Sequence, residues 1–273
     1  MSAPLDIDLI RQRLEAHAAS EISLGNPITY LPQTGSTNDD AAAIANTGAP
    51  HGAIVIADEQ RFGRGRLGRS WFANPRENLT FSIVLRPQTS VEELSAMTLA
   101  AGLGVSDAVA MLLGGPDIES KDVGIKWPND VLVRSKKIAG ILLETRLVHG
   151  RCSHVIAGFG INVLQTNFDP SVEAIATSLA KESHVSVVRE DVFVLLLKCL
   201  SRRLEQFAHG GLSSMMKDIA ARDISMGRAV RVGEVQGIAE GIDVSGALRV
   251  LVNGSTQVLR TGELVYPAER RQP

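Results

Sequence analysis

The sequence predicts an α+β fold in which a mixed, mostly antiparallel sheet is flanked by helices and followed by a small all-β module. Before residue 223, apolar strand-like runs are interspersed with segments of helical periodicity that carry capping residues. Three closely spaced strands between residues 124 and 163 suit an antiparallel meander. After about residue 223 the chain consists of short valine-rich segments cut by glycine, which is typical of a small barrel.

Composition limits the class of protein. The 273 residues are 44% hydrophobic and 21% charged, as in a compact soluble protein with one large domain or one large and one small domain. The net charge of -2 argues against a protein that coats nucleic acid over its whole surface. The N-terminus has no apolar signal region, and the longest apolar run, residues 192–197, is far too short to span a membrane. We therefore expect a cytoplasmic protein.

Cysteine usage points to the same compartment. Cys152 and Cys199 have neither a CxxC spacing nor a neighbouring histidine cluster. Neither a zinc site nor a disulfide framework is indicated, and we expect both thiols to be reduced and structural.

The N-terminal third of the chain predicts two helices and three strands. Ser36 or Thr37 can cap the second helix, with Asp39 and Asp40 in its first turn and Gly48 just beyond its end. The segment "NLTFSIVLR" alternates apolar and polar side chains, so a strand with one buried face is expected there. In order, the elements are a short amphipathic helix at 5–18, a strand at 27–32, the capped helix, a buried strand at 53–58 and the alternating strand at 78–86.

The middle of the chain predicts a long helix and the meander. Ser90 and Glu93 form a capping box for a helix that runs to about Leu113. The strands that follow are "GIKW", then "VLVRSKKIAGILLETRLV" with a turn at its "SKK", and then "SHVIAGFGINV". Two further helices are expected at 188–208 and 213–221.

A glycine and arginine loop follows the buried strand at 53–58. Its core is "GRGRLGR", which brings three arginines and three glycines together immediately before Ser70 and Trp71. Glycines can let backbone N–H groups approach an anion while the arginines supply positive charge. An ordinary solvated loop and a nucleic-acid contact are the alternatives. The lysine and the Ser or Thr that end a Walker A loop are absent.

Three other motifs have both a structural and a functional interpretation. The "PND" of "IKWPNDVLV" is either an ordinary turn or part of a polar site with Lys126. Lys137, in "SKKIAGILLE", precedes an apolar strand, where a lysine often only extends its amine to solvent. The glycines of "GFGIN" mark either a bend in a strand or a place where a ligand can lie flat on the sheet.

The order of these motifs is more specific than any one of them. From "GSTND" through "EQ", "GRGRLGRSW", "KWPNDV", "KIAGILLE", "GFGIN" and "ATSL" to the C-terminal module, the chain resembles the biotin protein ligases along nearly its whole length. The resemblance implies the biotin/lipoate ligase catalytic fold over residues 1–222 and an SH3-like barrel over residues 223–273. It also implies a reaction in which biotin and ATP form biotinyl-5'-AMP, from which biotin is transferred to a lysine of a carrier protein.

The resemblance also assigns residues that bind biotin and the adenylate. The ureido ring would be held by Ser36, Thr37, Asn38 and Gln60. In the arginine loop, Arg64, Gly65 and Arg66 would contact biotin and the phosphate, beside Gly63. Arg69 would help to bind the nucleotide, and Trp71 would offer a face for the adenine. Gly158 and Gly160 would permit close approach of the ligand, and Asn162 would lie near the adenosine together with the "ATSL" segment at 176–179.

The residues expected to act on the reacting groups come from two motifs. By resemblance, Lys137 reaches the biotin carboxylate and the α-phosphate, Lys126 stabilises the triphosphate, and Arg66 completes the cationic set. Asn129 and Asp130 would organise Mg²⁺ and nucleotide, and Asp130 would also help to deprotonate the incoming lysine. Two anions meet when a carboxylate attacks a phosphate, so cations and a metal ion are the groups this chemistry needs.

Departures and partners complete the comparison with the family. Positions 61 and 62 carry arginine and phenylalanine where smaller or uncharged residues are more usual. The segment before Pro27 is short for an additional folded domain, which indicates the ligase-only type without the DNA-binding domain of the bifunctional members. The expected partner is a biotin carboxyl carrier protein or the biotinyl domain of an acyl-CoA carboxylase. The exposed "LETRLV" strand leaves a monomer or a homodimer open.

Two rival functions remain at the level of sequence. A lipoate-protein ligase has a related fold and also forms an acyl-adenylate, but lipoyl lacks the ureido group that the "STN" motif and Gln60 suit. A DNA-binding repressor that uses the arginine loop is disfavoured by the near-neutral charge.

Overall fold

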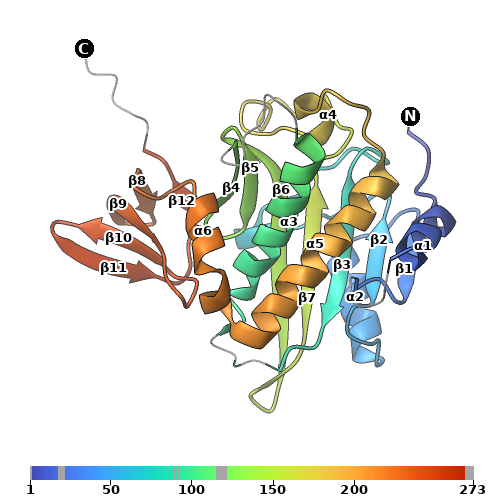
Figure 1. Ribbon diagram of the computed structural model, residues 1–273, viewed down its shortest axis with the longest axis horizontal. Helices are drawn as coiled ribbons and strands as arrows, with labels where there is room; N and C mark the ends of the chain where they lie inside the picture. The colour runs from blue at the N-terminus through green and yellow to red at the C-terminus, as the bar shows by residue number, and fades with distance from the viewer. Residues whose placement is uncertain (1, 18–21, 89, 91–92, 115–121, 268–273) are drawn as a thin grey trace.

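The computed structural model describes residues 2–17, 22–88, 90, 93–114 and 122–267. A seven-stranded sheet has the order β1-β2-β3-β7-β6-β5-β4, and a five-stranded sheet near the C-terminus has the order β11-β10-β9-β8-β12 (Figure 1). Only β1 and β2 pair in parallel, so the larger sheet is mixed and mostly antiparallel, as predicted. Its strands are β1 (Ile28–Leu31), β2 (Ile54–Ala57), β3 (Leu79–Leu85), β4 (Val123–Lys126), β5 (Asp130–Val133), β6 (Lys136–Val148) and β7 (Arg151–Ile161).

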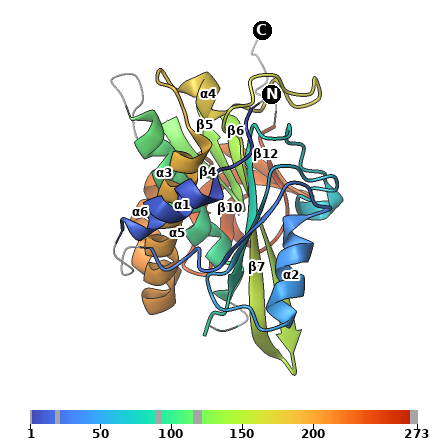
Figure 2. The ribbon, with the colours of Figure 1, turned by 90° about the vertical axis from the view of Figure 1, so that its right-hand side faces the viewer.

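Helices cover the two faces of the larger sheet unequally. The long helices α3 (Met97–Leu113) and α5 (Arg189–Gly210) lie on one face, with α1 (Ile7–Glu15) beside α5. On the opposite face lies α2 (Thr37–Asn46), which leaves part of that face open (Figure 2). This asymmetry decides where a ligand can reach the sheet.

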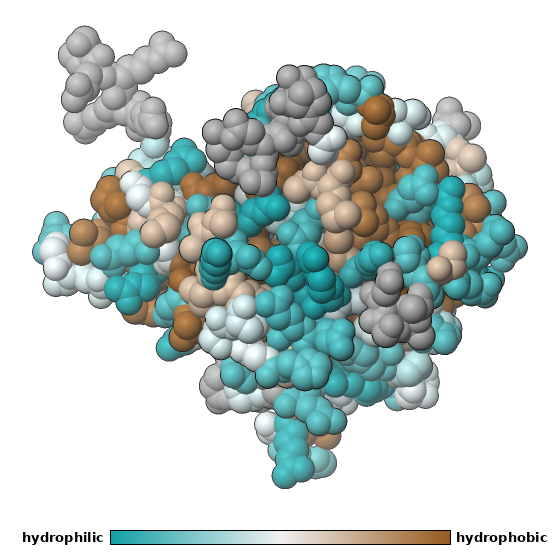
Figure 3. Space-filling view, in the orientation of Figure 1, coloured by the Kyte–Doolittle hydropathy of each residue, from teal (hydrophilic) through white to brown (hydrophobic). Residues whose placement is uncertain are grey.

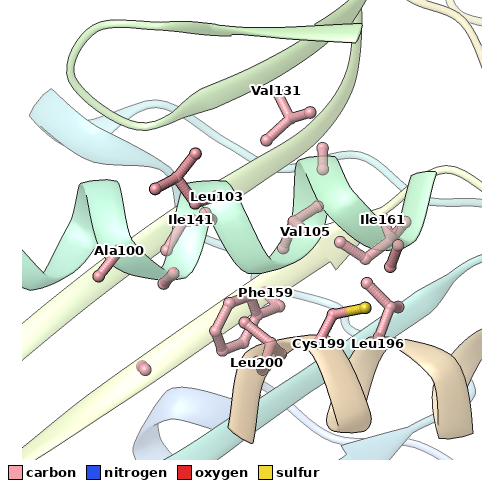
Figure 4. Close-up of a cluster of buried hydrophobic side chains, with 14 of the residues drawn as sticks. Ala100, Leu103, Val105, Val131, Ile141, Phe159, Ile161, Leu196, Cys199 and Leu200 are labelled. Carbon is pink, nitrogen blue, oxygen red and sulfur yellow. The ribbon is translucent and has the colours of Figure 1, made fainter. Parts of the chain in front are cut away.

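The main core fills the space between the sheet and the paired helices. Side chains from α3, α5, β6 and β7 meet there, and Leu103, Leu200 and Ile161 are fully buried (Figure 4). Gly104 lets the two helices approach closely, because a Cβ at this position would lie 3.0 Å from the Cα of Leu200. Burial of this apolar surface supplies most of the free energy that stabilises the fold.

Most of the predicted elements are confirmed, with four differences. The predicted helix from Ser90 begins as an α-helix only at Met97, because residues 93–99 make i→i−3 bonds of the 3₁₀ type. Ser90 does bond to the carboxylate of Glu93, which is one half of the predicted capping box. The intervening residues 91 and 92, like residue 89, lie outside the described part of the chain.

The second difference concerns β3, whose residues are all buried although one face was expected to meet solvent. The helix α2 and the polar site described below cover that second face, so its Thr80 and Ser82 are buried with hydrogen-bond partners. The third difference is in the helix predicted at 213–221, which is a 3₁₀ turn at Leu212–Met215 followed by α6 (Met216–Arg222). A short helix, α4 (Leu179–Glu182), was not predicted.

The C-terminal residues form the second sheet, which is antiparallel throughout. It meets the larger sheet near β4. Ile125 bridges Asp223, in the segment that leads into the second sheet, and the indole of Trp127 donates to the carbonyl of Gly246, between β9 and β10, at 3.0 Å. These contacts bring its last strand beside the site described below. Its strands are β8 (Ala229–Val232), β9 (Val235–Ile242), β10 (Leu248–Val252), β11 (Ser255–Leu259) and β12 (Leu264–Val265).

A buried ion pair joins β2 to α5. Asp58 and Arg189 are 6% and 3% exposed, and the guanidinium lies 2.9 Å from the carboxylate. Tyr30 donates its hydroxyl to the second carboxylate oxygen at 2.7 Å, and burial together with this bond raises the pKa of Tyr30 to about 12. Both charges are therefore paired and hydrogen-bonded, as buried charges must be.

The surface differs over the two ends of the long helices. In the view of Figure 3, hydrophilic residues cover α6 and the C-terminal half of α5, while apolar atoms gather where the end of α3 meets α5. Met111, at that end of α3, is 63% exposed. Within the described residues, the helices lack either the length or the apolar composition that crossing a lipid bilayer requires.

Removing one partner of the buried ion pair should be costly. We expect Arg189→Met to lower the free energy of unfolding by about 3–5 kcal/mol, because it strands the charge of Asp58 in the interior. Urea denaturation followed by circular dichroism would measure this. Combining it with Asp58→Asn should restore part of the loss, and a single variant as stable as the wild type would contradict the interpretation.

Burial raises the pKa of Asp223, against the opposing effect of hydrogen bonds from Ser225. A carboxyl whose pKa is raised on folding stabilises the folded state below its ordinary pKa, and this contribution is lost as the pH rises through the raised value. Asp223→Asn should therefore gain stability over the wild type at pH 7.5 and lose that advantage towards pH 4. Urea unfolding of both proteins at the two pH values measures this, and equal differences would contradict it.

Candidate active site

The site lies on the face of the larger sheet that α3 and α5 do not cover. Residues alternate between the faces along β7, so Phe159 and Ile161 point towards the core while Gly158 and Gly160 face the opposite side. Gly140 of β6 pairs with Gly160 across the two strands. Neighbouring glycines thus leave a flat floor of backbone atoms, while a ligand on this floor stays a prediction.

The indole of Trp71 lies on this floor. A Cβ at Gly160 would lie 2.2 Å from the indole, and one at Gly140 would lie 3.1 Å from it, so only glycine admits the ring at these distances. The amine of Lys137 lies 5.4 Å from the ring centroid. The indole nitrogen is buried and makes no hydrogen bond to the described residues. Trp71 is therefore placed to stack on a planar ligand or to give way to one.

The arginine loop folds back on itself above the floor. Arg64 bridges Ser70, the N–H of Gly65 donates to the carbonyl of Arg69 at 2.7 Å, and the N–H of Trp71 donates to that of Gly63 at 2.8 Å. Leu67, at the tip, has a φ of 57° in the left-handed region, which is strained for a leucine. The loop is consequently a narrow hairpin, which lies near α2 in Figure 2 and borders the pocket.

The unusual residues at positions 61 and 62 do not enter the pocket. Their N–H groups donate to the carbonyls of Thr34 and Gly35 at 3.0 and 2.9 Å, and Phe62 is 73% exposed. The path of the chain into the loop is thus fixed by backbone hydrogen bonds, which do not depend on side-chain type.

The arginines of the loop are held by two different parts of the protein. Arg64 makes two hydrogen bonds to Asp39, at 2.6 and 2.7 Å, and a longer one to Glu144. These contacts raise the pKa of Arg64, and the hydrogen bonds from Arg64 lower that of Asp39. The loop is thereby fastened to α2 and β6 by charge-assisted hydrogen bonds.

The C-terminal sheet holds the other two arginines. Arg66 donates to the carbonyl of Gly262 at 3.1 Å, and Arg69 pairs with Glu263. Burial lowers the pKa of Arg66, although nearby carboxylates oppose the effect. The arginine loop and the segment before β12, which lie far apart in the sequence, therefore meet at the pocket, and Glu263 lines it.

One end of the pocket is a network of hydroxyl and amide groups. Gln60 accepts from the N–H and the hydroxyl of Thr37, at 2.7 and 3.0 Å. Ser82, fully buried on β3, lies 2.6 Å from the amide oxygen of Asn38, whose nitrogen donates to Glu144. Because the amide oxygen of Gln60 accepts twice, its nitrogen is left to donate elsewhere. This end can therefore recognise a ligand that carries both donors and acceptors.

The other end is cationic. Lys137 pairs with Asp130 at 2.8 Å, and Lys126 lies nearby beside the ring of Tyr266. Burial lowers the pKa of Lys126, while Asp130 and Glu263 partly oppose the shift. The amide nitrogen of Asn129 donates to the carbonyl of Ile141 at 2.9 Å, which fixes the turn that presents Asp130. Lysines in this setting can attract an anion, and the carboxylates can attract a cation.

Most of the residues selected from the sequence border a single pocket. They are Ser36, Thr37, Asn38, Gln60, Arg64, Gly65, Arg66, Arg69, Trp71, Lys126, Asn129, Asp130, Lys137, Gly158 and Gly160. The structure does not place Gly63 and Asn162 on its wall. Gly63 instead borders a shallower hollow beside the loop, where a Cβ would meet the carbonyl oxygen of Trp71 at 2.6 Å.

Asn162 orders the adjoining segment. Its amide donates to the carbonyl of Thr177 at 2.9 Å, and its N–H donates to that of Ile138. Lys137 bridges Ala176 in the same region. The "ATSL" segment is therefore fastened next to Lys137, which places it beside the cationic end.

Some polar or glycine residues of the site were not selected from the sequence, among them Ser70, Ser82, Gly140, Glu144 and Glu263. Gly140 and Glu144 lie inside "KIAGILLE", so that motif carried a signal for them. Ser82 and Glu263 have no motif of their own, and only the fold brings them to the pocket. Within the described residues, His, Cys, Asp and Glu side chains do not form a cluster of three or more suited to a resident metal ion.

Comparison with known proteins identifies the family of the chain. Residues 30–162 match the model of the biotin/lipoate A/B protein ligase family. The chain is 36% identical to the biotin–[acetyl-CoA-carboxylase] ligase of Mycobacterium tuberculosis, over 96% of this chain and 98% of that one.

Solved structures give the same assignment. A biotin protein ligase from Aquifex aeolicus in complex with biotin and ATP has a TM-score of 0.74 and 29% identity, covering 87% of this chain and 97% of that one. The ligase from Leishmania major in complex with biotinyl-5-AMP has a TM-score of 0.58 and 25% identity, with 85% and 98% covered. The chain therefore belongs to the biotin/lipoate A/B protein ligase family, and within it to the biotin protein ligases.

Proposed function

We propose that this protein is an ATP-dependent ligase that converts biotin to biotinyl-5'-AMP and then transfers biotin to a lysine of a biotin carboxyl carrier protein. The observation that carries the proposal is the single pocket in which an amide and hydroxyl end faces a cationic end. Relatives that share this fold hold biotin with ATP, or biotinyl-5-AMP. The two ends match the two ends of that intermediate.

In the first step, a carboxylate oxygen of biotin forms a bond to the α-phosphorus of ATP while the bond to pyrophosphate breaks. Lys137, released from Asp130, would neutralise the carboxylate and the α-phosphate oxygens as they approach. Arg66 and Lys126 would face the phosphates, and Arg69 would exchange Glu263 for the nucleotide. The loop would also keep water away from the mixed anhydride.

The donor set at the cationic end fits Mg²⁺ that arrives with ATP. Magnesium in such sites is held by one or two carboxylates together with phosphates and water. Asp130 supplies one carboxylate, Glu263 lies on the same rim, and the amide oxygen of Asn129 is not used by its bond to Ile141. When bound, the ion supplies positive charge to the phosphate oxygens.

At the other end, the ureido group would meet the "STN" motif and Gln60. The free donor of Gln60 suits the ureido carbonyl, and the hydroxyl of Ser36 or Thr37 suits an N–H or the same carbonyl. A lipoyl ring would leave these buried polar groups without partners, at a cost of about 1–3 kcal/mol each. This comparison favours biotin over lipoate.

The second step places an amine of the carrier at the acyl carbon, and AMP leaves. Asp130, beside Lys137, is the carboxylate proposed to take the proton from that amine.

We also propose a catalytic domain over residues 1–222 and an SH3-like domain over 223–273, of which 268–273 lie outside the described residues. We also propose that the protein acts in the cytoplasm, where ATP and carboxylase carriers are found. We propose further that it is a monomer or a homodimer and that it does not bind DNA.

The function is tested by ATP–pyrophosphate exchange in the purified protein with biotin, with lipoate and without an acid. Exchange that requires biotin supports the proposal, and transfer of labelled biotin to a purified carrier domain then tests the second step. Exchange with lipoate alone would assign the chain to the rival activity, and exchange with neither acid would contradict both.

Loss of the pocket amine should impair the first step. We expect Lys137→Ala to lower the rate of biotinyl-5'-AMP formation by about 10²- to 10³-fold, the usual loss of one preorganised charge donor. Single-turnover formation of labelled adenylate measures this. Lys136→Ala is a matched control, because that neighbouring lysine is exposed. A rate near that of the wild type in a folded Lys137→Ala protein would remove the lysine from the site.

A methyl group on the floor should impair biotin binding. The Cβ of Gly158→Ala would lie 2.1 Å from the amide oxygen of Asn38, so the amide must move away from its bond to Ser82. We expect KM for biotin to rise by about tenfold or more, the effect of misplacing one recognition group. Gly102→Ala on α3 is the control, since its Cβ meets only ordinary contacts at 3.6 Å. Equal KM values for the two variants would contradict the assignment.

A further inference from the structure

A buried polar cluster holds both bases of the arginine loop, and we call it the loop anchor. It consists of Asp58, Asn78, Gln165 and Arg189, which are 6%, 3%, 4% and 3% exposed. Asp58 immediately precedes the loop, and its carbonyl accepts from the N–H of Arg76, just beyond the loop, at 3.0 Å. Arg189 contacts both Asp58 and the carbonyl of Asn78, which makes the cluster continuous.

Gln165 is the member that reaches the second base of the loop. Its amide oxygen accepts from the N–H of Asn74 at 3.2 Å and from the side chain of Asn78. Its amide nitrogen donates to the carbonyl of Asn167 at 3.0 Å. The amide orientation follows from these partners, because Asn78 already uses its own oxygen to accept from Val163.

The contacts of Gln165 join two segments near the cationic end of the pocket, where the nucleotide is proposed to bind. Asn74 lies three residues after Trp71, whose indole covers the glycine floor. Val163, held by Asn78, directly follows Asn162 at the end of β7. Gln165 does not line the pocket. Its amide therefore sets the distance between the two segments without touching a ligand.

We propose that Gln165 is a positioning residue that controls how firmly the arginine loop retains the acyl-adenylate. The inference rests on the proposed function, because it requires biotinyl-5'-AMP to lie in the pocket that the arginine loop borders. The physical reason is that Asn74 is the point where the roof of the pocket returns to the core. Loss of Gln165 as an acceptor would remove the bond that ties the N–H of Asn74 to the core and would leave the buried side-chain amide of Asn78 without this partner, which favours opening of the loop.

The test compares three proteins. Gln165→Leu removes the acceptor at similar volume, while Gln165→Glu, as the neutral acid that burial favours, keeps an acceptor oxygen towards Asn74 and Asn78 and a donor towards Asn167. Val109→Ala, a core change on α3 at a residue that is 1% exposed, controls for a general loss of stability. Release of preformed labelled biotinyl-5'-AMP is followed by rapid filtration, and amide hydrogen exchange is measured without ligand. Gln165→Ala, whose vacated space can take a water, replaces the leucine variant if that variant does not fold.

For Gln165→Leu we expect release of the adenylate to be about tenfold faster, since one buried hydrogen bond is lost. Exchange over residues 63–74 should also be faster. Gln165→Glu should restore both to within about twofold, and Val109→Ala should change neither. Release and exchange equal to those of the wild type, or equal to those of Val109→Ala, would overturn the proposal. A wild type that forms no adenylate would instead contradict the proposed function. Amide hydrogen exchange over residues 63–74 would still show whether Gln165 stabilises the loop.

Discussion

The site depends on the absence of side chains along two neighbouring strands. Gly140 and Gly160 face each other across β6 and β7, and Gly158 follows at the next position on the same face. Because the other face of these strands must carry Phe159 and Ile161 for the core, the alternation of a strand reserves one face for packing and the other for close approach. Trp71 and Asn38 both occupy space that a Cβ would take. The glycines therefore determine how closely Trp71 and Asn38 approach the backbone of β6 and β7.

The charges of the loop are balanced by the protein's own carboxylates. Arg64 lies against Asp39, Arg69 against Glu263 and Lys137 against Asp130. An anionic ligand that reaches Arg69 or Lys137 must replace a carboxylate there rather than meet an unpaired cation. Such an exchange yields less net free energy than a new ion pair would, but it keeps the groups aligned before the ligand arrives. Under the proposed function, the carboxylates released in this way, Asp130 and Glu263, are those that would then hold Mg²⁺ at the same edge.

Sequence patterns predicted those parts of the fold and the site that are local. The strands, α2 and α5 follow from apolar periodicity and capping residues, and the pocket residues come from short motifs rich in glycine and charge. Ser82, Glu263 and Gln165 could not be selected, because their roles arise only when β3, the C-terminal sheet and the segment after β7 meet the loop. The start of α3 was misplaced because a capping pair at Ser90 and Glu93 stabilises a 3₁₀ turn as readily as an α-helix.

The polar interior at the loop base suggests why such a costly arrangement is kept. Replacing Asp58 and Arg189 by apolar residues would remove the desolvation penalty of two charges, so stability alone does not explain the pair. Polar networks differ from apolar cores in that their partners must meet at defined distances and angles. A base held in one geometry can support a hairpin that carries strain at Leu67, and it fixes where the hairpin lies relative to the glycine floor.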